Sequence, residues 1–156
     1  MRILLAIDDS KYSQEALRKL IAQTKRGSQV RVLNVVESIG GYISAGLIPH
    51  VVSMAPGMEE DRVKQAKDLV RRMARKLRKA GFKTSEAVEE GDPKSKIIDH
   101  AENWNADLII LGSHGWKGLN RFLLGSVSEA VARHANCSVE IVRIRNAARM
   151  ARKSAQ

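Results

Sequence analysis

Between residues 112 and 128 this chain carries residue types and spacings that suit the binding of phosphate. Glycines at 112, 115 and 125 and a serine at 126 form the pattern G-x2-G-x9-G-S. Glycine lets backbone N–H groups approach an anion closely, and the first turn of a helix adds unpaired N–H groups and a positive dipole end. An apolar run at 108–111 precedes the glycines and a helical apolar pattern follows them. The stretch therefore predicts a strand, a phosphate-binding loop and a helix.

Two better-known phosphate motifs are excluded. A Walker A loop needs Lys directly after the second Gly of G-x-x-x-x-G, followed by Ser or Thr, and no such run occurs. A dinucleotide fingerprint needs G-x-G-x-x-G, and Gly112 and Gly115 are too far apart to begin one. Lys117 and Arg121 add positive charge to the loop.

Strand and helix patterns alternate along the chain and position this loop. Apolar runs predict strands at 2–7, 30–36, 82–88, 108–111 and 138–144. Helices are predicted at 11–25 and 58–80, after an Asp92 N-cap with Pro93 at the first helical position, and after Gly125. The last helix has an apolar stripe of Val127, Ala130, Val131 and His134. This alternation predicts βαβ units and a parallel sheet.

Asp8 follows the first predicted strand, at the edge where open parallel sheets bind ligands. Right-handed crossovers bring the ends of strands one and four to a common crevice, so Asp8 and the glycine loop should meet there. A carboxylate at this edge can accept hydrogen bonds from ribose hydroxyls or adenine. The alternative is helix capping, and we assign Asp8 to the ligand and its neighbours Asp9 and Ser10 to capping.

Composition bounds the function classes. A single cysteine, Cys137, excludes an intrachain disulfide framework and favours a reducing, cytoplasmic location, with Cys137 as a small buried hydrophobe. The four histidines have no metal-ligand spacing, so no metal site is predicted. No stretch approaches the roughly 18 apolar residues of a membrane helix, and the first residues are too short a run for a signal peptide.

The net charge of +10 suits an anionic ligand or partner. Helix 58–80 has a densely basic outer face without interleaved aromatic residues, which favours a solvated surface over a nucleic-acid platform. The long, apolar stretch 37–57 is equally consistent with a flap over a nucleotide, a partner contact or disorder.

The glycine pattern, with MRILLAIDDS at the start and CSVEIVR near the end, resembles the universal stress protein family over residues 1–145. The resemblance implies a three-layer α/β sandwich with a five-stranded parallel sheet, of the adenine nucleotide α-hydrolase-like, Rossmann-like type. It also implies ATP binding, with or without Mg²⁺, and a homodimer joined through the last strand. Residues 146–156 form a basic tail outside this domain. One departure is Ser138, where many members have Pro.

We therefore expect an ATP-binding regulatory protein of the stress-response type, with weak or no hydrolysis. No carboxylate or glutamine is evidently placed to orient water, and there is no Walker lysine. The alternative is a basic interaction module that binds nucleic acid or acidic protein partners; nucleic acid is the less favoured partner. The residues assigned to the nucleotide are Asp8, Val36, Gly112, Gly115, Gly125, Ser126, Val127 and Ser128.

Overall fold

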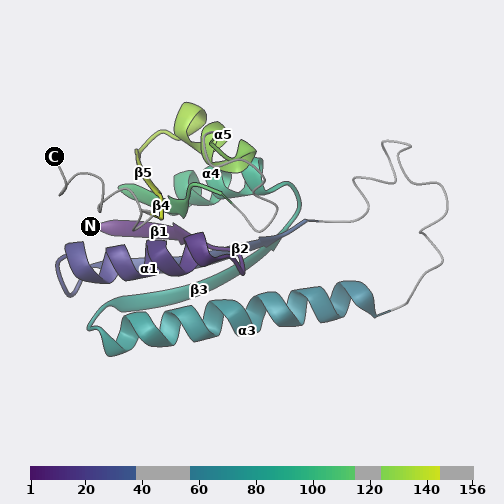
Figure 1. The fold of residues 1–156 in the computed structure, drawn as a ribbon, viewed down its shortest axis with the longest axis horizontal. Helices are drawn as coiled ribbons and strands as arrows, with labels where there is room; N and C mark the ends of the chain where they lie inside the picture. Colours follow the sequence, from purple (N-terminus) through teal and green to yellow (C-terminus); the bar gives the residue numbers. More distant parts are fainter. Residues whose placement is uncertain (38–56, 115–123, 145–156) are drawn as a thin grey trace, which may run out of the picture.

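A computed structural model describes residues 1–37, 57–114 and 124–144. Its elements, in chain order, are β1 (Arg2–Ala6), α1 (Lys11–Gln23), β2 (Gln29–Val36), α3 (Met58–Lys79), β3 (Lys83–Glu90), α4 (Pro93–Asn103), β4 (Leu108–Gly112), α5 (Ser126–His134) and β5 (Ser138–Val142). The strands form one five-stranded parallel sheet in the order β3-β2-β1-β4-β5 (Figure 1). The predicted parallel sheet is confirmed.

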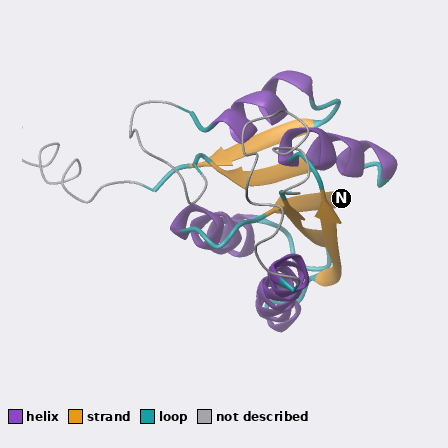
Figure 2. Ribbon diagram, turned by 90° about the vertical axis from the view of Figure 1, so that its right-hand side faces the viewer, coloured by secondary structure: helices purple, strands orange, loops and turns teal. Residues whose placement is uncertain are grey.

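Helices cover both faces of the sheet (Figure 2). One apolar cluster joins α1 and α3 to one face, and the other joins α4 and α5 to the opposite face. The central strand β1 shows why its sequence is a continuous apolar run, since Ile3, Leu4 and Leu5 are all fully buried. The three-layer α/β sandwich is therefore as predicted.

The pairing of β1 with β4 brings two distant parts of the chain together. The register runs from Ile3 beside Leu108 to Ala6 beside Leu111. Because both strands point the same way, the segment after Ala6 and the segment after Leu111 leave the sheet side by side. This places Asp8 near the glycine loop, as predicted.

Two predictions in the last part of the chain need correction, one on the end of a strand and one on a buried position. The last strand was predicted to reach residue 144 but ends at Val142, because its partner β4 ends at Gly112 and Gly112–Val142 is the final pair. Ile144 is exposed. His134, predicted on the apolar stripe of α5, is also exposed, because it is the last helical residue and Val131 is the last one to reach the core.

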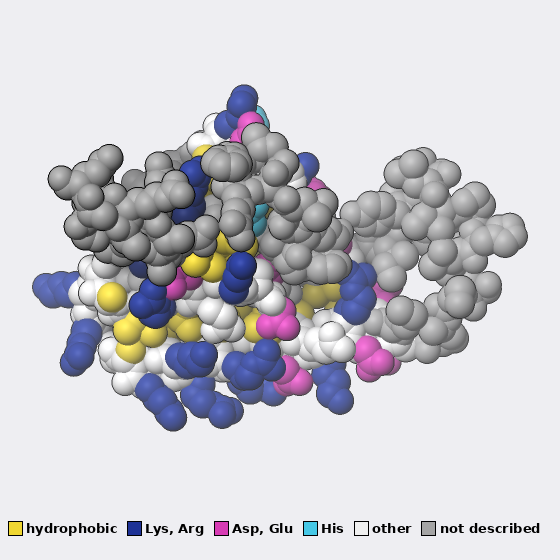
Figure 3. Space-filling view, in the orientation of Figure 1, with side chains coloured by type: hydrophobic (Ala, Val, Ile, Leu, Met, Phe, Trp, Pro, Cys, Tyr) yellow, Lys and Arg dark blue, Asp and Glu magenta, His cyan; other side chains and the backbone are white. Residues whose placement is uncertain are grey.

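The outer face of α3 is basic and exposed, as predicted. Figure 3 shows Lys and Arg side chains gathered along the α3 side of the molecule. Two of these arginines form ion pairs, Arg71 with Asp68 at 3.0 Å and Arg78 with Glu86 at 2.6 Å. The cations from residue 71 to 79 are Arg71, Arg72, Arg75, Lys76, Arg78 and Lys79.

Several sequence predictions fall outside the described residues: the stretch between Glu37 and Gly57, loop residues Gly115, Lys117 and Arg121, and the basic tail 146–156. Within the described ranges, no helix is both long enough and apolar enough to cross a membrane.

Asn34 ties β2 to the end of β1 and gives the first prediction. It is 9% exposed, and its Nδ2 donates to the carbonyl of Ile7 at 2.7 Å. Asn34→Leu keeps the volume but leaves a buried carbonyl unpaired. We expect it to lower the free energy of unfolding by about 1–3 kcal/mol in urea denaturation.

Asn136→Leu is the matched control. Asn136 is exposed, and its amide lies 3.3 Å from Glu102 at the surface. This substitution should change the free energy of unfolding by less than about 0.5 kcal/mol. Equal losses for the two variants would contradict a special role for the Asn34 bond.

Candidate nucleotide site

A cavity of about 1000 Å³ opens at the carboxyl edge of the sheet. It is bounded by the ends of β1, β2 and β4, the first turns of α1 and α5, and one side of α3. The assigned residues that line it are Asp8, Val36, Gly112, Gly125, Ser126, Val127 and Ser128. The eighth, Gly115, lies outside the described residues.

Asp8 is positioned by the start of α1. Its Oδ1 accepts hydrogen bonds from the hydroxyls of Ser10 and Ser13, each at 2.6 Å, and the Asp8 N–H donates to Ser13 Oγ at 2.9 Å. Ser10 is the N-cap of α1, its side chain accepting from the Ser13 N–H. The cavity-lining carboxylate of Asp8 and the cap of α1 thus form one network. Ser10 caps the helix as predicted, and Asp9 is exposed.

The first turn of α5 presents backbone donors to the cavity. Gly125 is the N-cap, and the first helical bond runs from the Glu129 N–H to the Gly125 carbonyl at 2.9 Å. The N–H groups of residues 126–128 therefore have no acceptor within the helix. Together with the positive end of the helix dipole, they suit a bound anion.

The two serines of this turn differ. Ser126 is exposed, so its hydroxyl can reach a ligand. Ser128 is buried, and its Oγ lies 2.8 Å from the Gly125 carbonyl and 3.2 Å from that of Ser113. The Ser128 hydroxyl donates inside the protein, so this residue offers a ligand its backbone N–H.

Close packing within the protein requires glycine at 112 and leaves little room for a side chain at 125. A Cβ on Gly112 would lie 2.6 Å from Tyr12 Cβ, and one on Gly125 would lie 3.1 Å from the Ser113 carbonyl oxygen. Gly125 has φ −64°, which any residue can adopt. Glycine at these positions lets the start of α1 and the loop after β4 approach each other at the cavity wall.

Val36 forms part of the apolar wall. Its side chain is buried and lines the cavity. Its carbonyl already accepts the Gly91 N–H at 3.0 Å. Val36 therefore gives a ligand mainly its side chain, beside the equally buried Ile97.

Sequence reasoning missed Ser113. It is 1% exposed; its carbonyl accepts the Gly125 N–H at 2.9 Å and its N–H donates to the Val142 carbonyl at 2.8 Å. Ser113 thus joins β4, β5 and the start of α5. No sequence pattern marks it, because its role depends on backbone groups that are distant in the chain. His114, next to it, lies with its ring 5.1 Å from the Tyr12 ring.

Two other predictions bear on chemistry. Cys137 is half-buried against the α4–α5 side of the core, and burial, with a smaller effect from Asp107, raises the pKa of its thiol. A raised pKa leaves less thiolate at neutral pH, which is the behaviour of a structural cysteine. Among the described residues, no three His, Cys, Asp or Glu side chains could hold a metal together.

Comparison with known proteins points to one family. The model of the universal stress protein family matches residues 1–143. Universal stress protein Sll1388 of Synechocystis is 32% identical over 152 residues, covering 90% of this chain and 96% of that protein.

Solved structures agree. The structure of protein MJ0577 covers 94% of this chain and 97% of its own, with a TM-score of 0.78 and 28% identity. A universal stress protein from Archaeoglobus fulgidus, solved in complex with dAMP, has a TM-score of 0.63 and 22% identity, covering 92% of this chain and 98% of its own. The family match over nearly the whole chain, together with the shared sheet and helices, shows that this protein belongs to the universal stress protein family.

Proposed function

We propose that this protein binds an adenine nucleotide, ATP, at the carboxyl edge of its sheet and acts as a nucleotide-dependent regulator. One observation carries the proposal: a single cavity is lined by a carboxylate at the end of β1, an apolar wall at the end of β2 and the open first turn of α5. These groups match the ribose, the base and the phosphates of a nucleotide. The dAMP complex of the Archaeoglobus relative supports an adenine nucleotide in this fold.

The proposed pose follows from the donors. The phosphates lie on the N–H groups of residues 126–128 and the Ser126 hydroxyl, where the helix dipole favours negative charge. Asp8 accepts from a ribose hydroxyl, and Val36 packs against the base. Mg²⁺ accompanies ATP as the counter-ion of its phosphates and keeps several of its waters, as Mg²⁺ commonly does.

We do not propose that the protein hydrolyses ATP rapidly. Among the described residues of the cavity, Asp8 Oδ1 is held by two serine hydroxyls, and His114 Nδ1 lies 3.1 Å from Ser113 Oγ. Neither arrangement is a base oriented toward a phosphate-bound water.

A cytoplasmic location stays a prediction from the single cysteine.

The phosphate assignment predicts the behaviour of two Ser126 variants. Ser126→Asp adds a carboxylate at the positive end of the α5 dipole, which is a stabilising position. The free energy of unfolding of the variant should therefore equal that of the parent or exceed it by about 0.3–1 kcal/mol. The same charge repels the phosphates, and at about 4 Å and an effective dielectric near 20 this repulsion reaches a few kcal/mol. We expect ATP affinity to fall about a hundredfold in titration calorimetry.

Ser126→Ala is the control for this test. It removes one hydrogen bond to a charged phosphate oxygen at an exposed position, worth about 1.5 kcal/mol, so the affinity should fall by roughly tenfold, less than in Ser126→Asp. If Ser126→Asp binds ATP as well as the parent protein, the phosphates are not at the start of α5.

The assignment of Asp8 to the sugar predicts that Asp8→Asn changes the affinity for ATP and the affinity for inorganic triphosphate differently. Asp8→Asn keeps one oxygen for the serine hydroxyls but removes the charge that we assign to the ribose. Affinity for ATP should fall roughly tenfold, the scale of one charge-assisted hydrogen bond. Affinity for inorganic triphosphate should stay equal or rise, because a negative charge near the anion is gone.

Asp9→Asn removes the same charge from the neighbouring exposed position. It should shift ATP and triphosphate in the same direction, since charge alone changes. A parallel loss of both ligands in Asp8→Asn would show that Asp8 does not contact the nucleoside.

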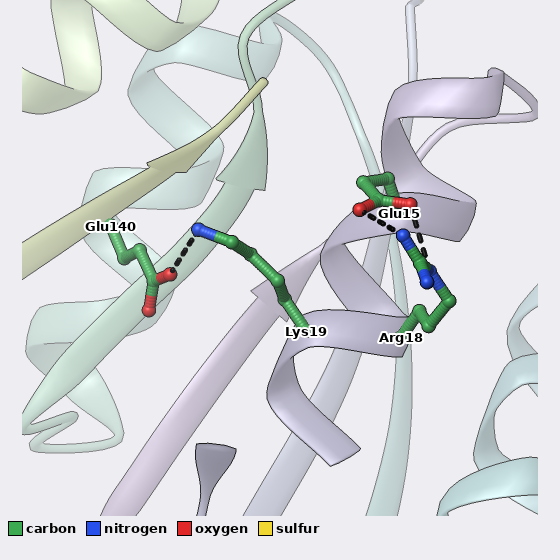
Figure 4. A network of polar contacts seen from close by, with 4 residues as sticks. All are labelled: Glu15, Arg18, Lys19 and Glu140. Atoms are coloured by element: carbon green, nitrogen blue, oxygen red, sulfur yellow. Dashed lines mark hydrogen bonds and ion pairs between the residues drawn. The ribbon is translucent and has the colours of Figure 1, made fainter. Parts of the chain in front are cut away.

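We also propose a homodimer joined through β5. In the described chain, β5 is an edge strand that pairs with β4 alone, and Val139 and Ile141 are only half-buried. An exposed, apolar strand edge favours pairing with a second copy about a two-fold axis. Glu140 of this strand forms an ion pair within its own chain, with Lys19 of α1 at 3.5 Å (Figure 4).

The alternation of backbone groups allows a clean test. The Val142 carbonyl faces β4, where it accepts the Ser113 N–H, so the Ile141 N–H faces the outer edge. Ile141→Pro should therefore remove a donor needed by a dimer while leaving the β4–β5 pairing intact. We expect light scattering to give a dimeric parent and a monomeric variant at micromolar concentration.

Thr84→Pro is the matched control at the opposite edge of the sheet. The Lys83 N–H donates to the Ser28 carbonyl on the β2 side, so the Thr84 N–H faces outward from β3. This variant should remain dimeric. A monomeric parent, or dissociation by both prolines alike, would contradict a β5 interface.

A further inference from the structure

Asn34 of β2 carries a hydrogen-bond acceptor that the described chain leaves unused. It is buried, and it also lines the nucleotide cavity. Its Nδ2 donates to the Ile7 carbonyl at 2.7 Å. Because a carbonyl can only accept, the amino group of the amide faces Ile7 and Oδ1 faces the other way. Across the described residues, no hydrogen bond reaches this Oδ1.

The Asn34 oxygen opens into the cavity. No side-chain nitrogen or oxygen of the described residues is both shut off from solvent and without a hydrogen bond. Oδ1 therefore reaches open space, and the cavity is the open space that Asn34 lines. The other buried polar side chains of the described chain differ, because each of their hydroxyls already has a hydrogen bond within the protein: Ser10, Ser13, Ser113 and Ser128.

Asn34 and the carboxylate of Asp8 lie on the same side of the sheet. Side chains alternate along β2, so Asn34 falls on the face of Val32, which packs with α1 and α3. Asp8 is held from that side by the hydroxyl of Ser13 in α1. Ile7, to which Asn34 is bonded, directly precedes Asp8 in the chain. The two acceptors are therefore neighbours in the cavity wall.

The proposed nucleotide pose puts the ribose at this pair of acceptors. With the phosphates at the start of α5 and the base at Val36, the sugar lies over the end of β1, which is between β4 and β2. Val36 is two residues further along β2 than Asn34, about 7 Å nearer to the carboxyl edge. The amide of Asn34 instead reaches across to β1 through its bond to Ile7. We therefore assign its oxygen to the sugar and not to the base.

We propose that Asn34 Oδ1 accepts a hydrogen bond from the ribose hydroxyl that Asp8 does not bind, so that the site selects ribonucleotides over deoxyribonucleotides. This inference rests on the proposed nucleotide function. The 2′- and 3′-hydroxyls of ribose are adjacent and can both donate, so two neighbouring acceptors fit them. A nucleotide that fills the cavity excludes water from Oδ1, and a sugar without the hydroxyl leaves this oxygen unpaired. A site built to bind a hydroxyl rejects the analogue that lacks it for this reason.

Titration calorimetry with ATP, 2′-deoxy-ATP and 3′-deoxy-ATP tests the proposal on the parent protein. We expect each deoxy ligand to bind roughly three- to tenfold more weakly than ATP, the scale of one hydrogen bond. The proposal fails if either deoxy ligand binds as well as ATP. Failure of the parent protein to bind ATP at all would instead contradict the proposed function.

Two variants assign the two losses of affinity to their acceptors. Asn34→Leu should bring one deoxy ligand to within about twofold of ATP and leave the loss for the other intact. Asp8→Asn should reduce that other loss and leave the first intact. If Asp8→Asn abolishes both losses, or if Asn34→Leu abolishes neither, Asn34 does not contact the ribose.

Val32→Ala is the matched control for lost stability. Val32 is buried on the same face of β2 but does not line the cavity. Shortening this side chain lowers the free energy of unfolding without removing an acceptor. Both sugar losses should therefore stay at the values of the parent protein.

Inosine triphosphate is the control for the base, because it has an oxo group in place of the 6-amino group of adenine. Asn34→Leu should leave the ratio of the affinities for ATP and inosine triphosphate unchanged. If this ratio changes while both sugar losses persist, the amide of Asn34 binds the base and the proposal is wrong.

Discussion

The parallel pairing of β1 with β4 is the constraint on which the site depends. It joins residues about a hundred positions apart in register and makes both strands end at one level of the sheet. Everything that lines the cavity from the α1 side and the α5 side leaves from those two ends. The pairing is stable because β1 is buried on both faces and its side chains are fully enclosed by helices of both layers. Burial of this order contributes about 25 cal/mol per Å² of apolar surface. The hydrophobic core therefore fixes the geometry of the site, and core residues such as Ala6 and Leu111 also form part of its wall.

The site itself is assembled from the groups that end secondary structure. Ser10 caps α1 and also donates a hydrogen bond to Asp8. The same side chain therefore fixes both the orientation of the carboxylate and the start of the helix. The Ser113 carbonyl accepts the Gly125 N–H, so the end of β4 sets where α5 begins. Helix starts and strand ends have unpaired backbone groups in any protein of this architecture. In this protein some of these groups pair with one another, as the Gly125 N–H does with the Ser113 carbonyl. The N–H groups of residues 126–128 have no acceptor within the helix and belong to residues that line the cavity. A ligand then meets donors that are held in place before it arrives.

The sequence predicted what depends on local pattern and topology. Apolar runs and helical spacing predicted the strands and helices, and the crossover rule brought Asp8 to the glycine loop. The sequence could not reveal that Gly112 is needed because Tyr12 packs on it. Nor could it reveal that the Ser128 hydroxyl is bonded to the carbonyls of Gly125 and Ser113. The contacts of Gly112 with Tyr12 and of Ser128 with Ser113 join segments that are distant in the sequence. It also placed His134 on the core side of α5, since periodicity does not say where the sheet beneath a helix ends. The basic residues of helix 58–80, Arg72 among them, were predicted to face solvent for a similar reason. Helical spacing marks them as outside the core, and only the tertiary arrangement decides whether outside means solvent or a cavity.

The charge of the whole chain is a poor guide to its site. The net charge is +10, yet the acidic residues among the described cavity lining, Asp8, Asp9, Glu37 and Asp68, outnumber its arginines, Arg62 and Arg72. Basic residues on the surface attract a polyanion over a Debye length of about 8 Å at physiological ionic strength, which affects its rate of arrival. Inside the cavity, the favourable groups are backbone N–H donors and two localised guanidiniums, against carboxylates that repel. Such a lining favours an anion whose negative charges sit at the α5 turn and beside α3, and it disfavours one whose charge falls near Asp8. The position of charge on the ligand, more than its amount, should decide what this site binds.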